Sequence, residues 1–585
     1  MSSITKFISL PLCICLGMFA GCAKQSPTPQ VAPAATADTS AAWAAIPDRF
    51  IEDYFKAQPF FAAQSGRHEF DGQMPDLSAA GIQKEIARLH AARAVIDAFD
   101  PAGLKPSQQL ERDVLLNVVD RDLFELEKAR WPARNPAWYL GRLDPDVYLS
   151  RNYAPLAERL KAYIGYARAV PGIAAAIQAN LQTPLPKPYV EYGVKAFGGF
   201  ADFYRKDVVK AFAGVQDAEL QKQLREANAA AATAMSQLQS WFVAQRKDAN
   251  DNFAIGADLF AQMVKEMERV DVPVAMIEAA GKADLARNTE ALTAACAAYL
   301  PNGTLAACVA KMAANKPKGS VIDAARAQLV DLKSFIQKHD IVTIPSNEEA
   351  LVATAPPYNA ANFAFINVPG PYDHNVASTY NIAPPDPKWS RAEQAAYIPG
   401  KATLLNTSVH EVWPGHFLQF LHSNANPSKA QGLWVGYAFA EGWAHYCEEM
   451  MWDEGLGAGD PELHIAQLRD ALLRDVRLLS AIGLHTHGMS VAESEAMFKE
   501  KAFQDAGNAR QQSTRGTYDP GYLNYTLGKL MIRKLRSDWI AKKNLPAGTD
   551  DKTQWHAFHD QFLSYGGPPV PLVRREMLGE VGDVL

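Results

Sequence analysis

Helical periodicity dominates the first half of this chain and constrains its fold most strongly. From Trp43 to about Lys338, apolar residues recur at intervals of three and four, as in the stretch GIQKEIARL at residues 81–89. This spacing places apolar side chains on one face of an α-helix. The chain has 585 residues, of which 48% are hydrophobic, so it can bury a large core in roughly two to four lobes. The sequence therefore predicts an all-helical N-terminal lobe over residues 43–340.

The pattern changes between Ile341 and Pro387. Prolines interrupt this segment and separate short β-prone runs such as FAFINV at residues 363–368. Helical periodicity returns from about Ser390 to Leu535, and a Pro/Gly-rich segment follows near residues 566–569. We therefore predict a mainly α fold, in which residues 341–585 form a small β insert followed by a second helical lobe.

Residues 1–22 have the pattern of a bacterial export signal. Lys6 precedes an apolar run over residues 7–20, and FAGC at residues 19–22 resembles a lipobox, whose cysteine becomes acylated. Cys22 is then predicted to tether the protein to a membrane. The competing interpretation is an ordinary signal peptide, because Phe19 is larger than the usual Leu or Val. The apolar run is shorter than the roughly 18 to 20 residues that a transmembrane span needs.

Residues 23–42 are rich in Ala, Pro, Thr, Ser and Gln and contain few large apolar side chains. Such a composition cannot support a packed core and predicts a flexible linker. Ala23 is not the Asp that commonly signals retention in the inner membrane. The expected location is the bacterial cell envelope, with the lipid anchor in the outer membrane and the protein facing the periplasm.

Two cysteines of the mature chain, Cys296 and Cys308, flank a Pro-Asn-Gly turn at residues 301–303 between two Ala-rich helical stretches. Export to an oxidising compartment favours a disulfide between them, which would close this helical hairpin. The alternative is that the two cysteines are buried free thiols.

Charged residues of both signs are interleaved along the chain, and the net charge is -6. A phosphate backbone requires a basic footprint. Nucleic acid is therefore not an expected partner.

Potential metal ligands are concentrated between His410 and His487, where seven of the 13 histidines lie. The stretch opens with HEVWPGH at residues 410–416, which begins like the zincin motif HExxH but has two more residues before the second histidine. Pro414 disfavours an undistorted α-helix, and a kink or widened turn at Pro414–Gly415 could return His416 to the face of His410. The alternative is a proline-kinked core helix whose histidines satisfy only polar needs.

A second segment adds Glu441, His445 and Glu448, at spacings of four and seven. These residues share one helix face. Three ionisable groups on a stretch rich in Phe, Trp, Tyr and Ala would be costly to bury without a cation or charged partners. The alternative is a solvated acidic stripe that contains a Glu–His pair.

The two motifs together, HExxPGHxxQ from His410 and EGWAHY from Glu441, resemble the domain of unknown function 885 family, which contains many candidate bacterial lipoproteins. The resemblance extends over most of the mature chain, including IGLH at residues 482–485 and PGYLNYTLGK at residues 520–529. More distantly, the chain looks like helical gluzincin peptidases of the thimet oligopeptidase, angiotensin-converting enzyme and thermostable carboxypeptidase types. That likeness implies an elongated, two-lobed helical body with a deep channel and a zinc ion at its floor.

The gluzincin likeness also implies a set of metal ligands and roles. Zn²⁺ would be held by His410, His416 and Glu441, with His445 as the substitute for His416 because of the two-residue expansion. Glu411 would be the general base in the hydrolysis of a peptide substrate. By analogy, the donors to the oxyanion would come from five downstream residues, namely His485, His487, Tyr518, Tyr522 and Tyr525.

Several alternatives stay open at this point. The three tyrosines also fit a core stripe, because they recur at intervals of four and three. Glu448 and Asn406 are expected to orient the imidazoles. The protein could instead be an inactive, metal-containing lipoprotein that binds peptides or cell-wall fragments, or a hydrolase of a non-peptide amide. Glu411 separates binding from hydrolysis, because only hydrolysis needs a carboxylate beside the first ligand.

Overall fold

The computed structural model describes residues 39–355, 363–385 and 388–585. The predicted signal peptide, Cys22 and most of the predicted linker lie outside the described residues. The first helix, α1, begins at Thr39, within the last part of that predicted linker.

The N-terminal helices enclose a core of their own around Trp43, Phe55 and Leu115. Trp434 and Leu572 from the C-terminal part of the chain also belong to this core. The N-terminal helices therefore pack directly against the C-terminal part. The helices are α1 (Thr39–Trp43), α2 (Ile46–Ala57), α3 (Pro59–Gln64), η1 (His68–Phe70), α4 (Ala79–Asp97), η2 (Pro101–Gly103) and α5 (Pro106–Leu123), followed by the π-helical turn η3 (Phe124–Lys128).

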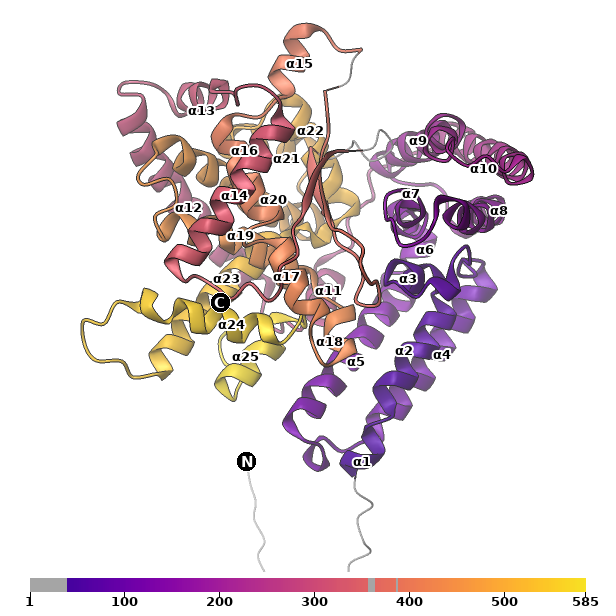
Figure 1. Ribbon diagram of the computed structural model, residues 1–585, viewed down its shortest axis with the longest axis horizontal. Coiled ribbons are helices and arrows are strands. Elements are labelled where there is room, and N and C mark those ends of the chain that lie inside the picture. Colours follow the sequence, from indigo (N-terminus) through magenta and orange to yellow (C-terminus); the bar gives the residue numbers. More distant parts are fainter. Residues whose placement is uncertain (1–38, 356–362, 386–387) are drawn as a thin grey trace, which may run out of the picture.

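The next helices form a separate layer, which lies at the right of Figure 1. Long helices α8, α9 and α10 pack through aromatic side chains, among them Tyr163, Tyr204 and Phe242. The helices of this layer are α6 (Trp131–Arg134), η4 (Pro136–Arg142), α7 (Asp146–Leu149), α8 (Leu156–Asn180), α9 (Lys187–Ala211) and α10 (Ala218–Gln245).

Four further helices complete the first half of the chain but pack against the second half. They are α11 (Ala257–Glu268), α12 (Val274–Tyr299), α13 (Leu305–Ala314) and α14 (Val321–His339). Their apolar side chains belong to the largest core of the molecule, which therefore crosses the lobe boundary expected at residue 340. The predicted disulfide between Cys296 and Cys308 is confirmed, and it joins α12 to α13.

The predicted small β insert is a three-stranded sheet in the order β1-β3-β2, with β1 at Leu351–Thr354, β2 at Ala364–Asn367 and β3 at Thr379–Ile382. β1 pairs with β3 in parallel, and β2 pairs with β3 antiparallel, with Ile366 opposite Tyr380. The sheet runs between the large helical body and the N-terminal helices (Figure 1). In the described residues no strand covers the second edge of β2.

The remaining helices build the large body. Two of them, α24 and α25, flank the Pro/Gly-rich segment at residues 566–569 and were not predicted from the sequence. Pro571 falls in the first turn of α25, where a missing N–H costs no helical hydrogen bond. These helices are α15 (Arg391–Tyr397), α16 (Lys401–Glu411), α17 (His416–Asn424), α18 (Lys429–Leu433), α19 (Tyr437–Asp453), α20 (Pro461–Thr486), α21 (Val491–Lys501), α22 (Ala506–Tyr518), η6 (Pro520–Leu523), α23 (Asn524–Lys542), η7 (Asp551–Gln554), α24 (Trp555–Ser564) and α25 (Val570–Leu578).

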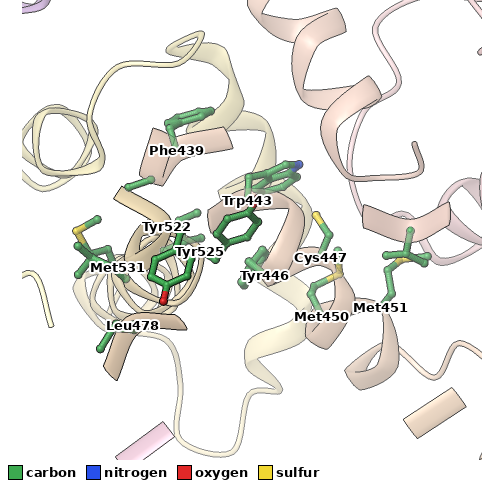
Figure 2. Packing of buried hydrophobic residues seen from close by; sticks show 14 of the residues in the cluster. Phe439, Trp443, Tyr446, Cys447, Met450, Met451, Leu478, Tyr522, Tyr525 and Met531 are labelled. Atoms are coloured by element: carbon green, nitrogen blue, oxygen red, sulfur yellow. The ribbon is translucent and has the colours of Figure 1, made fainter. Parts of the chain in front are cut away.

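Helices α19 and α23 cross at two glycines. A Cβ atom on Gly442 would lie 2.5 Å from Cα of Gly528, so only glycine allows this close approach. The crossing is embedded in large buried side chains, including Trp443 and Tyr446 of α19 (Figure 2). This packing fixes the face of α19 that carries the predicted acidic residues.

The architecture confirms the predicted mainly α fold with a small β insert. Of the helices in residues 39–355, 363–385 and 388–585, none combines the length and apolar character that a membrane crossing requires.

Candidate metal centre

The HEVWPGH segment folds as two helices joined by a tight turn, and not as one kinked helix. α16 ends at Glu411 and α17 begins at His416, with a cis peptide bond between Trp413 and Pro414 in the turn. A Cβ atom on Gly415 would collide with the carbonyl oxygen of His410. The compact turn therefore requires glycine at this position.

The turn is fixed to α19, because the indole Nε1 of Trp443 donates a hydrogen bond of 2.9 Å to the carbonyl oxygen of Pro414. As a result, the imidazole of His416 returns to that of His410. The two ring centroids are 4.8 Å apart and the rings are nearly perpendicular.

Three side chains converge beside this turn. Oε2 of Glu441 lies 3.4 Å from Nε2 of His410 and 3.3 Å from Nε2 of His416. Potential ligand atoms of the three residues all lie within 4.8 Å of one another. Tetrahedral zinc with bonds of about 2.0–2.1 Å would hold ligand atoms roughly 3.3–3.5 Å apart, and the carboxylate meets that spacing to both imidazoles.

Two buried polar atoms of this cluster lack a hydrogen-bond partner among the described residues. Within the described part of the chain, the buried Glu441 Oε2 and His416 Nδ1 have no hydrogen-bond partner. Since buried polar atoms are usually paired, the shared oxygen of Glu441 marks the place where a cation would be accommodated. The three side chains could hold one divalent metal ion.

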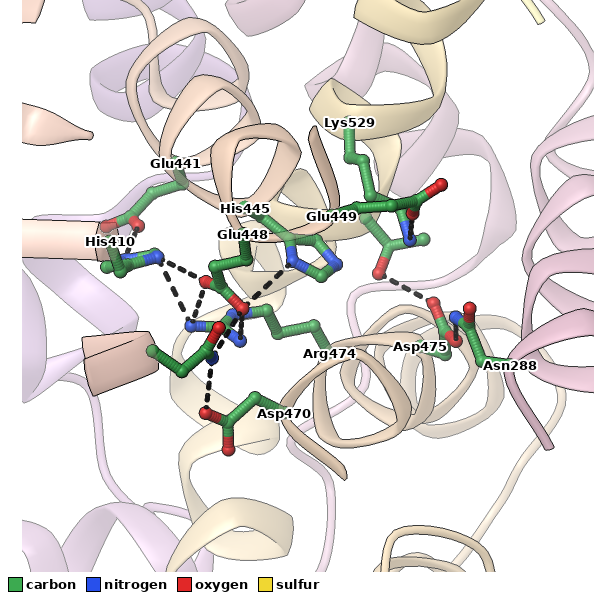
Figure 3. Close-up of polar contacts among 12 residues, drawn as sticks. Asn288, His410, Glu441, His445, Glu448, Glu449, Asp470, Arg474, Asp475 and Lys529 are labelled. Carbon is green, nitrogen blue, oxygen red and sulfur yellow. Dashed lines mark hydrogen bonds and ion pairs between the residues drawn. The ribbon is translucent and has the colours of Figure 1, made fainter. Parts of the chain in front are cut away.

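Glu448 orients the first histidine. Its Oε1 lies 2.7 Å from Nδ1 of His410, which leaves Nε2 of that ring directed at Glu441. Glu448 also accepts hydrogen bonds from Asn406 at 3.0 Å and from Arg474 at 2.9 Å (Figure 3). A carboxylate behind a histidine ligand fixes the tautomer and raises the basicity of the ring. Glu448 thus contacts an imidazole directly, whereas Asn406 contacts Glu448, and their orienting roles stay a prediction.

Arg474 was not found by sequence reasoning. It lies on α20, four residues after Asp470, which also contacts Asn406, at 2.8 Å. The spacing of Asp470 and Arg474 indicated a shared helix face, but nothing in it indicated that this face meets Glu448.

The electrostatics of the cluster favour a cation. Burial and Arg474 act to lower the pKa of His410, but the neighbouring carboxylates of Glu441 and Glu448 outweigh them and raise it to about 9. Burial alone would raise the pKa of Glu441, but His416 and His410 hold it well below its usual range. Both shifts reflect the attraction between the imidazoles and the carboxylates that surround them.

Glu411 lies beside the three converging residues but is not one of them. Its Oε2 accepts a hydrogen bond of 3.1 Å from the backbone N–H of Ile366 in β2. Burial raises the pKa of Glu411, against the opposing charges of His410 and His416. The side chain is thus held between the histidines and the sheet.

His445, the predicted substitute ligand, is not brought into the cluster. It is fully buried on the other side of Glu448, with Nδ1 at 3.7 Å from Glu448 Oε2 (Figure 3). Burial and the nearby Lys529 lower the pKa of His445 to about 3. The reason is its position on α19, since His445 shares a face with Glu441 but lies one turn, about 6 Å, further along the helix, beside Glu448 and Lys529.

Of the five predicted downstream donors, Tyr525 lies at the centre. Its ring is 6.4 Å from that of His410 and nearly parallel to it. Tyr437, which sequence reasoning missed, packs edge-on against Tyr525 at 5.8 Å. Tyr437 is one turn before Glu441 on α19, and that spacing could have identified it.

Within the described residues, none of the other four predicted donors makes a hydrogen bond, ion pair or ring contact with His410, His416 or Glu441. His485 is a core histidine whose Nε2 is 2.7 Å from the carbonyl oxygen of Gly516, and burial lowers its pKa to about 4. It lies eleven residues beyond Arg474 on α20, which corresponds to roughly 16 Å along the helix. Tyr522 is fully buried in the core, Tyr518 packs on Tyr192 and His487 pairs with Glu278 at the surface.

Fold and centre together define a mainly α protein with a buried His/His/Glu cluster suited to a metal ion. The family follows from comparison with known proteins. A family model described as a bacterial protein of unknown function (DUF885) matches residues 59–577. The chain belongs to the DUF885 family, which confirms the resemblance of the two motifs. No curated protein matches the chain.

Solved structures show the same fold. One is a "putative lipoprotein of unknown function" from Shewanella oneidensis, with a TM-score of 0.75 and 24% identity over 92% of this chain and 99% of that one. Another is a "putative lipoprotein" from Colwellia psychrerythraea, with a TM-score of 0.78 and 17% identity over 92% of this chain and 98% of that one.

Proposed function

We propose that this protein hydrolyses peptide bonds with a zinc ion bound by His410, His416 and Glu441. The observation that carries the proposal is the shared position of Glu441 Oε2, 3.3–3.4 Å from the two imidazole nitrogens, with the separate carboxylate of Glu411 beside it. Two histidines and a carboxylate form a zinc site that leaves a position open for reaction.

Zinc bound there would polarise the scissile carbonyl and lower the pKa of a water molecule. Glu411 then acts as the general base, because it adjoins the ligands without belonging to them. Its carboxylate takes a proton from the attacking water and transfers it to the leaving amine. The backbone N–H of Ile366 keeps that carboxylate in place.

In the described residues one edge of β2 is not paired with a strand, and this favours a peptide as the substrate. The N–H of Ala383 in the chain after β3 donates to the carbonyl oxygen of Phe363. The register pairs Ala364 with Ile382 and Ile366 with Tyr380. Residues of an antiparallel strand alternate between those that hydrogen-bond to the partner strand and those whose backbone N–H and C=O point away from it. Ala364 and Ile366 are of the second kind, which agrees with the hydrogen bond from the N–H of Ile366 to Glu411. An extended peptide could add to this edge as a further strand.

A cavity of about 360 Å³ lies beside the same strand and offers room for substrate side chains. Its lining combines Phe365 and Ile366 with Phe420 of α17 and Arg151 of the N-terminal part. Pockets that bind small ligands are usually concave and mostly apolar with a few polar groups, and this cavity has that composition.

The experiment is digestion of a broad peptide library by purified protein, with and without a metal chelator. We expect cleavage that the chelator abolishes and added zinc restores. Fully metallated protein that binds peptides but cleaves none would contradict the proposal and favour a binding lipoprotein.

We further propose that the protein is held in the bacterial envelope by a lipid on Cys22. The support is the lipobox-like sequence at residues 19–22, together with the description of both solved structures as lipoproteins. A periplasmic position at the outer membrane follows from Ala23 and belongs to the same proposal.

A further inference from the structure

Three residues of α20, Asp470, Arg474 and Arg477, follow one another at spacings of four and three and so share one helix face. The first two have partners in the metal centre. Asp470 accepts a hydrogen bond from Asn406, and Arg474 binds Glu448 at 2.9 Å. Arg477 is different, because its charge is not balanced.

Arg477 is buried, with only 8% of its surface exposed. Its Nε donates to Oε1 of Gln512 at 2.8 Å. Across the described ranges no carboxylate lies within 4.0 Å of its guanidinium, and the two terminal nitrogens make no hydrogen bond within the protein, although they are not fully enclosed and reach solvent.

The charges around Arg477 increase this imbalance. The nearby charged side chains are Arg474 and Arg515, which are also positive and are already paired with Glu448 and Asp519. Burial, with these two arginines, lowers the pKa of Arg477. A positive group that is largely buried and has no carboxylate partner favours the approach of an anion to its accessible end.

Arg477 belongs to the surroundings of the metal centre. Its guanidinium carbon lies 4.7 Å from the centroid of the Tyr525 ring, and that ring stacks on His410. Because Nε is occupied by Gln512, the two terminal nitrogens are the free end of the group. Two parallel N–H groups of arginine fit the two oxygens of a carboxylate.

We propose that Arg477 binds a carboxylate group of the peptide substrate, and this inference rests on the proposed function. The carboxylate comes either from the C-terminus of the peptide or from an Asp or Glu side chain. Either source supplies the missing charge, and both make the protein selective for peptides that place an anion near the scissile bond.

The test measures binding without turnover, by calorimetry on zinc-loaded Glu411→Gln protein. One peptide is used with a free C-terminus and as its amide, and each form is made with Asp and Glu or with Asn and Gln. We expect 10- to 100-fold weaker binding when the recognised carboxylate is removed, as for a hydrogen bond to a charged group. Loss on amidation identifies the C-terminus, and loss on replacement of Asp and Glu identifies a side chain.

Arg477→Met keeps the apolar stem over Tyr525 and should abolish the preference for the peptide that carries the carboxylate. Arg477→Lys keeps a positive charge and should retain part of that preference. Arg510→Met, at an exposed arginine of the neighbouring α22, is the matched control and should leave the preference unchanged. Equal binding of all four peptides to protein with Arg477 intact, or a preference that survives in Arg477→Met, would overturn the inference. If the protein prefers peptides with the carboxylate but the wild-type protein cleaves none of them, the peptidase proposal is contradicted and the role of Arg477 in binding is supported.

Discussion

At the scale of single residues, the buried histidines near the candidate site differ in their hydrogen-bond partners. His410 has both ring nitrogens engaged, one by Glu448 at 2.7 Å and the other facing Glu441. His445 has neither nitrogen hydrogen-bonded in the described residues and is fully buried. Position separates the two histidines, because His410 faces Glu441 and His416, whereas His445 lies on the other side of Glu448.

We expect about one zinc ion per chain in purified protein, and loss of that zinc in His410→Ala, His416→Ala and Glu441→Gln, because each change removes a ligand. His445→Ala should keep its zinc, although the cavity it creates lowers stability. Metal content by mass spectrometry after dialysis is the measurement. Zinc retained in His416→Ala but lost in His445→Ala would show that the second histidine ligand has been misassigned.

At the scale of elements, the turn at residues 412–415 determines whether the ligands meet. Gly415 approaches the carbonyl oxygen of His410 so closely that a Cβ atom has no room. Gly415→Ala should therefore separate α16 from α17 and weaken zinc binding by at least 10-fold. The control is Gly199→Ala in α9, where a Cβ atom meets open space and the helix should gain up to about 1 kcal/mol. Unchanged zinc affinity in Gly415→Ala would contradict the account of the turn.

Another prediction concerns the helices that support α19. Glu268 of α11 is buried and accepts hydrogen bonds from the N–H of Ala438 and the side chain of Asn524. Burial raises its pKa to about 7. The folded state thus holds this proton more tightly than the unfolded state, so the contribution of Glu268 to stability is fully present below about pH 4.5 and is lost as the pH rises through 7.

The size of this effect is on the order of 3 kcal/mol for a shift of this magnitude. The thermal midpoint of the wild-type protein should fall between pH 5 and pH 8 more steeply than that of Glu268→Gln, which cannot ionise. Parallel pH profiles for the two proteins would show that Glu268 is not responsible.

The elements also show what could be predicted from the sequence. Periodicity identified the helical halves, proline spacing located the small sheet, and the turn between Cys296 and Cys308 predicted their disulfide, because these signals are local. Arg474 could not be placed at the centre, since spacing defines a helix face but not its neighbour, whereas the position of Tyr437 one turn before Glu441 could have indicated it. His485 and Tyr522 were expected there by analogy, yet α20 carries His485 away from the centre and Tyr522 is buried in the core.

At the scale of the whole molecule, the large core joins helices from both halves of the chain around the centre. This explains why α11 to α14 pack with the C-terminal helices and not with α8 to α10. The sequence could not reveal this division, because the periodicity of all these helices is the same. The candidate site thus lies against the largest hydrophobic core of the described residues, which can hold its side chains in place.

A further prediction concerns the proposed lipid anchor on Cys22. Cys22→Ser removes the predicted site of acylation, so the protein should move from the membrane fraction to the soluble fraction after cell disruption. Immunoblotting of fractions is the measurement, with replacement of Cys447, a buried cysteine, as the control that keeps the anchor. A Cys22→Ser protein that stays with the membranes would show that another anchor exists.

The central claim is that Glu411 is the base of a zinc peptidase, and the Glu411→Gln variant tests it most directly. The substitution keeps the shape of the side chain but removes the proton acceptor. We expect this variant to retain zinc and bind peptide, yet to hydrolyse peptides 10²- to 10⁴-fold more slowly than the wild-type protein. Hydrolysis at the wild-type rate by Glu411→Gln, or loss of its zinc, would contradict the account.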